Sequence, residues 1–147
     1  MKYTSLSSAK LTLAITYFFC GLLIFLLVFA KPLVDWFFGL NRPEHSLTVL
    51  VSFYICSAPA VLALLNIIKL LKNIIKGEIF SEKNVSSLRI LSWCCMFVSF
   101  VCFVSGFFYV PMWIFSLGAA FMMLILRVLK NVMAKATEIK NENELTI

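Results

Sequence analysis

The stretch LTLAITYFFCGLLIFLLVFA, residues 11–30, decides the fold, because none of its residues carries a charge. A helix of about 20 mainly apolar residues is long enough to cross the hydrocarbon core of a bilayer. A cleaved signal peptide is the competing interpretation, but the run is longer than a usual signal core and no A-x-A site follows it. We therefore expect residues 11–30 to form a retained transmembrane helix.

The composition of the whole chain favours the membrane as its solvent. Of the 147 residues, 62% are hydrophobic and 14% are charged, whereas soluble domains average about 45–50% apolar and about 25% charged residues. A soluble domain of this size could not bury so much apolar surface. The composition therefore excludes a soluble globular domain and a disordered chain. The net charge of +6 indicates membrane topology and contact with anionic lipid rather than nucleic-acid binding.

Three further apolar segments are predicted to cross the membrane, at about residues 47–68, 90–110 and 112–128. Pro59 lies inside the first of these and is expected to kink it, with Ser57 as one group able to bond the freed carbonyl. The uncharged connection around Pro111 must be a tight hairpin between antiparallel helices. The prediction is an all-α polytopic membrane protein, a four-helix transmembrane bundle with a single domain over residues 1–147.

The remaining segments are predicted to lie outside the membrane. Residues 31–45 contain Pro32 and Pro43 and are expected to form a loop. Residues 69–89 form a basic loop that starts as a helical extension of the second span, and residues 129–147 form a tail that begins as a basic helix and ends frayed.

The distribution of positive charge predicts the orientation. Eleven of the 13 Lys and Arg residues fall in the N-terminal segment, the 69–89 loop and the tail, which share one side if there are four spans. Only Lys31 and Arg42 fall on the other side, and a three-span arrangement would lose this asymmetry. The positive-inside rule then places both termini in the cytoplasm.

Residues that could carry out catalysis are scarce. His45 is the only histidine, and the five cysteines lie in apolar runs, where they act as small packing residues. Ser57, Ser99 and Ser105 have no base within the spans and are expected to bond between helices. No central charge marks a proton or ion pathway. The sequence therefore predicts a protein that is not an enzyme and that holds no metal and no cofactor.

One stretch outside the spans has the character of a motif, NIIKGEIFSEKNVSSLRIL, residues 73–91. Gly77 is placed to cap the preceding helix, and Ser81 to start the next one. Asn84 can bond a free backbone end, and Phe80 is expected to insert back toward the bundle. Arg89 is expected to pair with a phospholipid phosphate, with Glu78 or with Glu82.

The same stretch supplies the candidate contact residues. Two interpretations stay open: a helix–turn–helix joint at the membrane surface, or a docking site for a cytoplasmic partner. The candidate residues for contact with a partner or with lipid are Lys69, Lys72, Lys76, Gly77, Phe80, Asn84 and Arg89.

Gly77, Phe80, Asn84, Leu88 and Arg89, after a second span that carries lysines, resemble the signature of a bacterial family of small membrane proteins catalogued as domain of unknown function 2975. Length and four predicted spans are also similar, although proline is frequent in the family where this chain has Ile79. The resemblance implies a bacterial cell membrane and a gene that is often paired with one for a small helix-turn-helix regulator.

We therefore expect a non-enzymatic membrane protein, regulatory or of the immunity type, that acts through protein contacts in the membrane or at the cytoplasmic loop. The expected partners are membrane lipids with anionic headgroups and a protein, with no nucleic acid. The alternative function is a small transporter or channel that works as a homo-oligomer. A membrane enzyme acting on lipid or isoprenoid would need paired acidic residues, which the spans do not contain.

Overall fold

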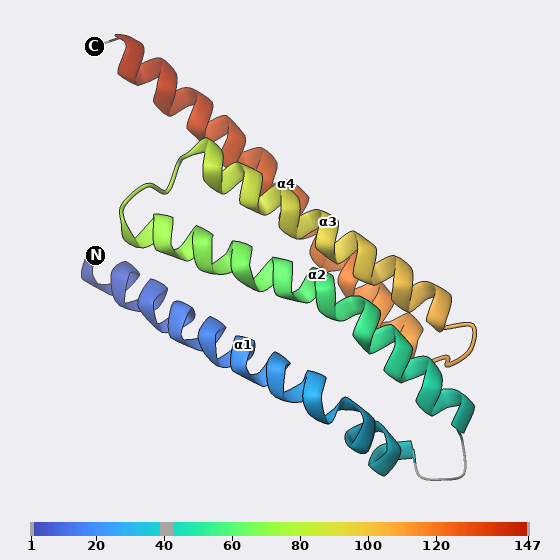
Figure 1. Cartoon of the computed structure of the whole chain (residues 1–147). Coiled ribbons are helices and arrows are strands. Elements are labelled where there is room, and N and C mark those ends of the chain that lie inside the picture. The colour runs from blue at the N-terminus through green and yellow to red at the C-terminus, as the bar shows by residue number, and fades with distance from the viewer. Residues whose placement is uncertain (1, 39–42, 147) are drawn as a thin grey trace.

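The computed structural model of the chain describes residues 2–38 and 43–146 (Figure 1). Its elements are the helices α1 (Lys2–Phe38), α2 (Pro43–Ile75), α3 (Glu82–Ser105) and α4 (Met112–Thr146). Each helix is long and apolar enough to cross a membrane. Strands are absent from the described residues, so the predicted all-α fold with four candidate spans is confirmed.

The four helices form an open row. α1 packs on α2, α2 on α3 and α3 on α4, and no other pair of helices is in contact within the described ranges. Both faces of the row are therefore open to lipid, and side chains such as Phe18, Phe100 and Phe121 are more than 60% exposed. This arrangement suits a bilayer, where apolar side chains lose nothing by facing hydrocarbon.

The two ends of the row contain different connections and termini. Figure 1 shows the N-terminus of α1, the connection between α2 and α3, and the C-terminus of α4 at one end, which we call the loop end. The α3–α4 hairpin lies at the other end, the hairpin end. The three segments expected to carry most of the positive charge therefore share one end, as an even number of spans requires.

The predicted loop over residues 31–45 is largely wrong. α1 continues through Pro32 to Phe38, and α2 begins at Pro43; residues 39–42, with Arg42, lie outside the described residues. An internal proline removes one backbone hydrogen bond, and in apolar surroundings the helix keeps all the others. Pro43 stands at the start of its helix, where the N–H that proline lacks would have no partner anyway.

The segments after the second and fourth predicted spans are largely helical. α2 continues to Ile75 and α3 begins at Glu82, which confirms the predicted helical extension and leaves residues 76–81 as the connection within the basic segment 69–89. The tail continues the predicted basic helix, and α4 runs without a break to Thr146. α2 and α4 therefore extend well beyond the roughly 30 Å that the hydrocarbon core requires.

Pro59 lies at the middle of α2, and Figure 1 shows that this helix changes direction near its middle. The carbonyl that Pro59 frees belongs to Ile55, four residues earlier. Ser57 does not bond it: its hydroxyl donates to the carbonyl of Tyr54 at 2.6 Å. The expectation that Ser57 bonds the freed carbonyl of Ile55 is therefore wrong. The hydroxyl of Ser57 bonds instead to the carbonyl of Tyr54, which lies one turn earlier in the same helix.

The best-packed part of the molecule is the loop-end half of α3. Seven residues of this half are buried: Asn84, Val85, Ser87, Leu88, Leu91, Ser92 and Cys94. Leu71 of α2 and Thr137 of α4 are also buried, at 8% and 1% exposure. Because α2 and α4 both pack on α3, this end of the row has a core of the kind that soluble proteins have, and it holds the candidate site.

Candidate functional site

Gly77 ends α2 in the way that the sequence predicts. Its φ is +87°, in the left-handed region that glycine enters without strain. The N–H of Gly77 donates to the carbonyl of Ile74 at 3.0 Å, and the N–H of Glu78 donates to the carbonyl of Asn73 at 3.0 Å. These two bonds form a Schellman motif, which satisfies the last carbonyls of the helix. The predicted cap is confirmed.

Asn84 is the centre of the joint between α2 and α3, and it is 0% exposed. Its Nδ2 donates to the carbonyls of Glu78 and Ile79, both at 2.8 Å. Its Oδ1 accepts a bond from Nδ2 of Asn73 in α2, also at 2.8 Å. The prediction that Asn84 bonds a free backbone end is confirmed. One side chain therefore fastens the last turn of α2, the connection and the first turn of α3 together.

Ser81 occupies the N-cap position of α3 with extended backbone, φ −141° and ψ 147°. Its carbonyl accepts bonds from the N–H groups of Asn84 at 3.0 Å and Val85 at 3.2 Å. Its hydroxyl makes no capping bond and is buried without a partner. The prediction that Ser81 starts α3 is therefore confirmed, although its hydroxyl does not form the bond that is usual for a serine at this position.

Ile79 and Phe80 form the exposed tip of the connection, with 43% and 42% of their surface accessible. The expectation that Phe80 inserts toward the bundle is therefore wrong. The interior of the joint is occupied by the amide of Asn84, which draws the carbonyls of Glu78 and Ile79 inward. Two large apolar side chains consequently remain at the surface of a well-bonded turn.

The three candidate lysines are exposed: Lys69 and Lys72 in α2, and Lys76 directly after its end. Their spacing of three and four residues places them on one face of the helix. Across the described ranges one ion pair occurs, Lys140–Glu144 at 3.8 Å, so these lysines are not neutralised by carboxylates of the described chain. They form a cationic strip that leads along α2 to the connection.

Arg89 does not belong to this strip. It lies on α3 and lines a separate cleft with Arg127 and Lys130 of α4. The expected pairing of Arg89 with Glu78 or Glu82 is not formed in the described part of the chain. The seven candidate residues thus separate into a structural joint (Gly77 and Asn84), an exposed group (Phe80 and the lysine strip) and Arg89 in its own cleft.

We expect Gly77→Val to lower the melting temperature in detergent and the amount of protein in the membrane. No atom lies within 4 Å of a Cβ added at Gly77, so the effect would come from the positive φ alone. A β-branched residue in this conformation costs about 1–2 kcal/mol. Gly77→Asn is the matched control, because asparagine tolerates the left-handed region. Equal melting of the Val variant and the wild type would contradict this account of the cap.

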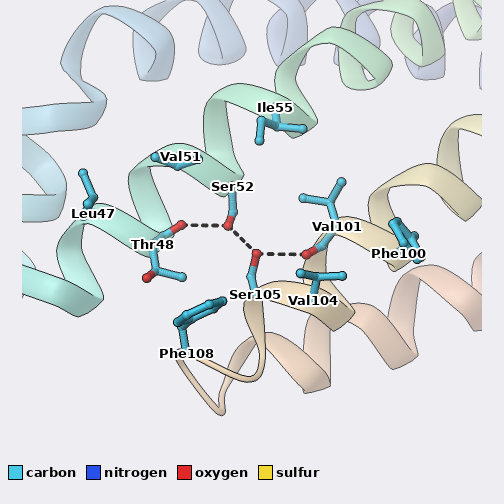
Figure 2. Close-up of a pocket in the computed structure, with 10 residues that line it drawn as sticks. All are labelled: Leu47, Thr48, Val51, Ser52, Ile55, Phe100, Val101, Val104, Ser105 and Phe108. Carbon is cyan, nitrogen blue, oxygen red and sulfur yellow. Dashed lines mark hydrogen bonds between the residues drawn. The ribbon is translucent and has the colours of Figure 1, made fainter.

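Polar contacts also join the helices inside the predicted spans. Figure 2 shows Ser52 of α2 and Ser105 of α3 facing each other beside a cavity of about 410 Å³. Their Oγ atoms are 2.6 Å apart. Each also approaches a carbonyl of its own helix, that of Thr48 at 2.7 Å and that of Val101 at 2.9 Å. The two hydroxyls have two protons for these three contacts. At any moment one serine therefore donates to the other, and the second serine donates to the carbonyl of its own helix.

A second polar contact joins α3 to α4. The hydroxyl of Ser99 donates to the carbonyl of Ser116 at 2.9 Å, and the hydroxyl of Ser116 donates to the carbonyl of Ser99 at 2.8 Å. The prediction that Ser99 and Ser105 bond between helices is therefore confirmed. Ser57 differs, because it bonds within its own helix.

We expect Ser105→Ala to reduce the free energy of unfolding by about 0.5–1 kcal/mol, the usual size of one polar contact between membrane helices. The effect is small because Ser52 keeps its bond to the carbonyl of Thr48. Thermal unfolding in micelles measures it, with Ser86→Ala on the exposed face of α3 as the control. A loss larger than about 2 kcal/mol would show that Ser105 supports more than this pair.

Apart from the cleft at Arg89, the other cavities between helices are mainly apolar. A groove of about 1030 Å³ between α2 and α3 is lined by residues that include Ile55, Pro59, Trp93 and Phe97. Among the residues that the structure describes, no group of three His, Cys, Asp or Glu side chains is placed to hold a metal ion. The arrangement offers surfaces for contact: an exposed apolar tip, a cationic strip and a cationic cleft.

Comparison with known proteins agrees with the resemblance found in the motif. The model of a family described as a protein of unknown function (DUF2975) matches residues 7–147. No curated protein and no solved structure matches the chain. The match covers all four helices, so it extends well beyond the residues that carry the motif.

Proposed function

We propose, for a chain that belongs to the DUF2975 family, a non-enzymatic regulatory or immunity-type function that works through protein contacts at the α2–α3 connection. The observation that carries this proposal is the exposed tip formed by Ile79 and Phe80. Exposed apolar side chains are ordinary within the bilayer, but outside it they mark interaction sites when they are held together.

The position of the tip supports contact with a protein rather than with acyl chains. The apolar part of α2, residues 47–68, is about 33 Å long and so fills the hydrocarbon core by itself. The connection begins eight residues later, which is about 12 Å further along the helix. The headgroup layer is about 5–8 Å deep on each side. The tip would therefore stand at the outer edge of the headgroups or beyond it.

The joint beneath the tip supports a docking function because it limits the motion of the connection. The Schellman motif and the buried Asn84 fix the backbone of residues 77–79 from both sides. A preorganised loop loses less conformational entropy on binding than a flexible one. The lysine strip flanks the tip, so the partner that fits has an apolar patch beside carboxylates.

The proposed location is a bacterial cell membrane with both termini in the cytoplasm. The support for this orientation is the excess of Lys and Arg in the three segments that meet at the loop end. We expect cysteines introduced at Lys76 and at Thr146 to react with an impermeant thiol reagent from the same side of the membrane. Labelling of these two positions from opposite sides would reject four spans with this orientation.

The alternative, a transporter or channel built from several copies, has less support. The polar residues that line the cavity in Figure 2 are Thr48, Ser52 and Ser105. The two serines bond to each other, and all three hydroxyls bond to backbone carbonyls of their own helices. The rest of that cavity and the larger groove beside Pro59 are lined mainly by apolar side chains. Flux of ions or cationic dyes through liposomes that contain the purified protein would favour this alternative over docking.

The docking proposal is tested by photo-crosslinking in native membranes. A photoreactive phenylalanine analogue at position 80 is expected to give one reproducible adduct with another protein. The same analogue at Trp36 is the matched control. This residue is 83% exposed and lies in the last turn of α1. We expect Ile79→Ser to weaken the adduct and to leave thermal unfolding unchanged. Adducts with lipid alone, or equal adducts at both positions, would overturn the proposal.

A further inference from the structure

A cleft between α3 and α4 gathers three cations, Arg89, Arg127 and Lys130. It has a volume of about 340 Å³ and is lined by Arg89, Ser92 and Trp93 of α3 and by Arg127, Lys130 and Asn131 of α4. We call it the basic cleft. Arg89 and Arg127 are exposed, whereas Lys130 is half-buried and Ser92 is buried. The hydroxyl of Ser92 donates to the carbonyl of Arg89 at 3.0 Å, so it supports the helix at this point.

The charge of the basic cleft is not balanced by the chain itself. Of the described residues, only Lys140 and Glu144 form an ion pair. The acidic residues closest to the cleft in the sequence are Glu82, seven positions before Arg89, and Glu138, eight positions after Lys130. Both are two helical turns away, about 10–12 Å along the axis. Three cations that converge without a carboxylate repel one another, and an anion placed among them would relieve this repulsion.

The depth of the cleft in the membrane indicates which anion is available. From Arg127 to the hairpin end, the uncharged part of α4 is residues 112–126, about 22 Å of helix. This is shorter than the hydrocarbon core of about 30 Å. Measured from the hairpin end, Arg127 would therefore reach no further than the edge of the core, and Arg89 lines the same cleft. An unpaired charge at that depth is unfavourable. Phospholipid phosphates form the layer of anions at this depth.

The donors of the cleft match a phosphate. Guanidinium groups bind phosphate oxygens with two parallel hydrogen bonds, and the amide of Asn131 and the ammonium of Lys130 add further donors. Trp93 is 55% exposed at the rim, which suits a ring that sits at headgroup level. We propose that the basic cleft binds the phosphate of an anionic phospholipid. This inference does not depend on the proposed docking function.

Native mass spectrometry of the protein released from nanodiscs tests the proposal. The nanodiscs contain phosphatidylglycerol or phosphatidylcholine, and the test variant is Arg89→Gln/Arg127→Gln/Lys130→Gln. We expect the wild type to retain phosphatidylglycerol at least about tenfold more strongly than the triple variant does. The matched control, Lys10→Gln/Lys83→Gln/Lys135→Gln, removes the same charge from exposed positions outside the cleft and should stay within about twofold of wild type.

Thermal unfolding adds a second measurement, the difference in melting temperature between wild type and the triple variant. We expect this difference to depend on the lipid. Phosphatidylcholine also has a phosphate, but its own choline cation balances that charge. In this lipid the triple variant should therefore melt no lower than wild type, because the substitutions remove the repulsion and no net anion is lost from the cleft. Phosphatidylglycerol should raise the melting temperature of wild type and of the control, but not that of the triple variant. Equal retention by wild type and triple variant, or no preference for the anionic lipid, would overturn the proposal. Displacement of the lipid by millimolar inorganic phosphate would assign the cleft to a free anion instead.

Discussion

Replacing Asn84 with alanine is expected to lower the free energy of unfolding by about 2–4 kcal/mol. The side chain is fully buried and serves two carbonyls and the amide of Asn73. Its removal leaves two acceptors and one donor without their partners, and each unsatisfied buried group costs about 1–3 kcal/mol. The total cost is smaller than the sum of these values if water enters the cavity left by the side chain and bonds the exposed groups. In a chain of this length the loss corresponds to roughly 5–15 °C in melting temperature.

The matched control for this variant is Asn66→Ala. Asn66 donates from its Nδ2 to the carbonyl of Leu62 in its own helix at 2.8 Å, so its loss orphans no group in another segment. We expect an effect below about 1 kcal/mol. Asn73→Ala should cost less in the Asn84→Ala background than alone, because the two amides share a bond. Similar losses at positions 66 and 84 would mean that the joint is not held by this network.

The transmembrane architecture was predictable because it depends on long apolar runs. The uncharged stretch at residues 11–30 and the three apolar runs after it each lie in a helix that is long and apolar enough to cross a membrane. The end of α2 and the start of α3 were also predicted, whereas the end of α1 was not. Pro32 was read as a loop residue, although α1 continues through it, because proline stops a helix less effectively where the alternative is an unbonded backbone in lipid.

The joint was predictable in part, for a reason that is visible in its residue types. Glycine at the end of a lysine-rich helix indicates a left-handed cap, and Gly77 has this conformation. The partner of Asn84 was not predictable, because Asn73 lies 11 residues earlier and on another helix. The exposure of Phe80 was missed for the same reason: whether a side chain of a connection turns inward depends on what already fills the joint.

The basic cleft could not be predicted from the sequence, because its cations are far apart along the chain. Arg127 and Lys130 lie about 40 residues after Arg89 and were counted only as charges that set the orientation. They face Arg89 because the α3–α4 hairpin folds the two helices back on each other with residues 106–111 at the turn. The geometry of that hairpin therefore decides whether the three cations meet, and the hairpin contains a close contact with the indole of Trp113.

Gly106 makes this contact, and we expect Gly106→Ala to destabilise the protein by about 2–3 kcal/mol. The backbone at Gly106 is right-handed, φ −62° and ψ −23°, so any residue could adopt it. An added Cβ would overlap Cδ1 and Nε1 of the Trp113 indole and lie 2.7 Å from its Cγ. The ring cannot move without loss, because its Nε1 donates to the carbonyl of Phe103 at 3.3 Å and it packs edge-on against Phe107.

Two companion variants separate this overlap from other effects of the substitution. Alanine is intrinsically better than glycine in a helix by about 1 kcal/mol, so Gly118→Ala in α4, where an added Cβ meets no atom within 4 Å, should be neutral or stabilising. The same exchange is thus expected to have opposite signs at two positions close to the hairpin. In a Trp113→Ala background Gly106→Ala should lose most of its effect, because the indole is gone. If Gly106→Ala remained as harmful there, the cause would lie in the backbone of the turn and not in the indole.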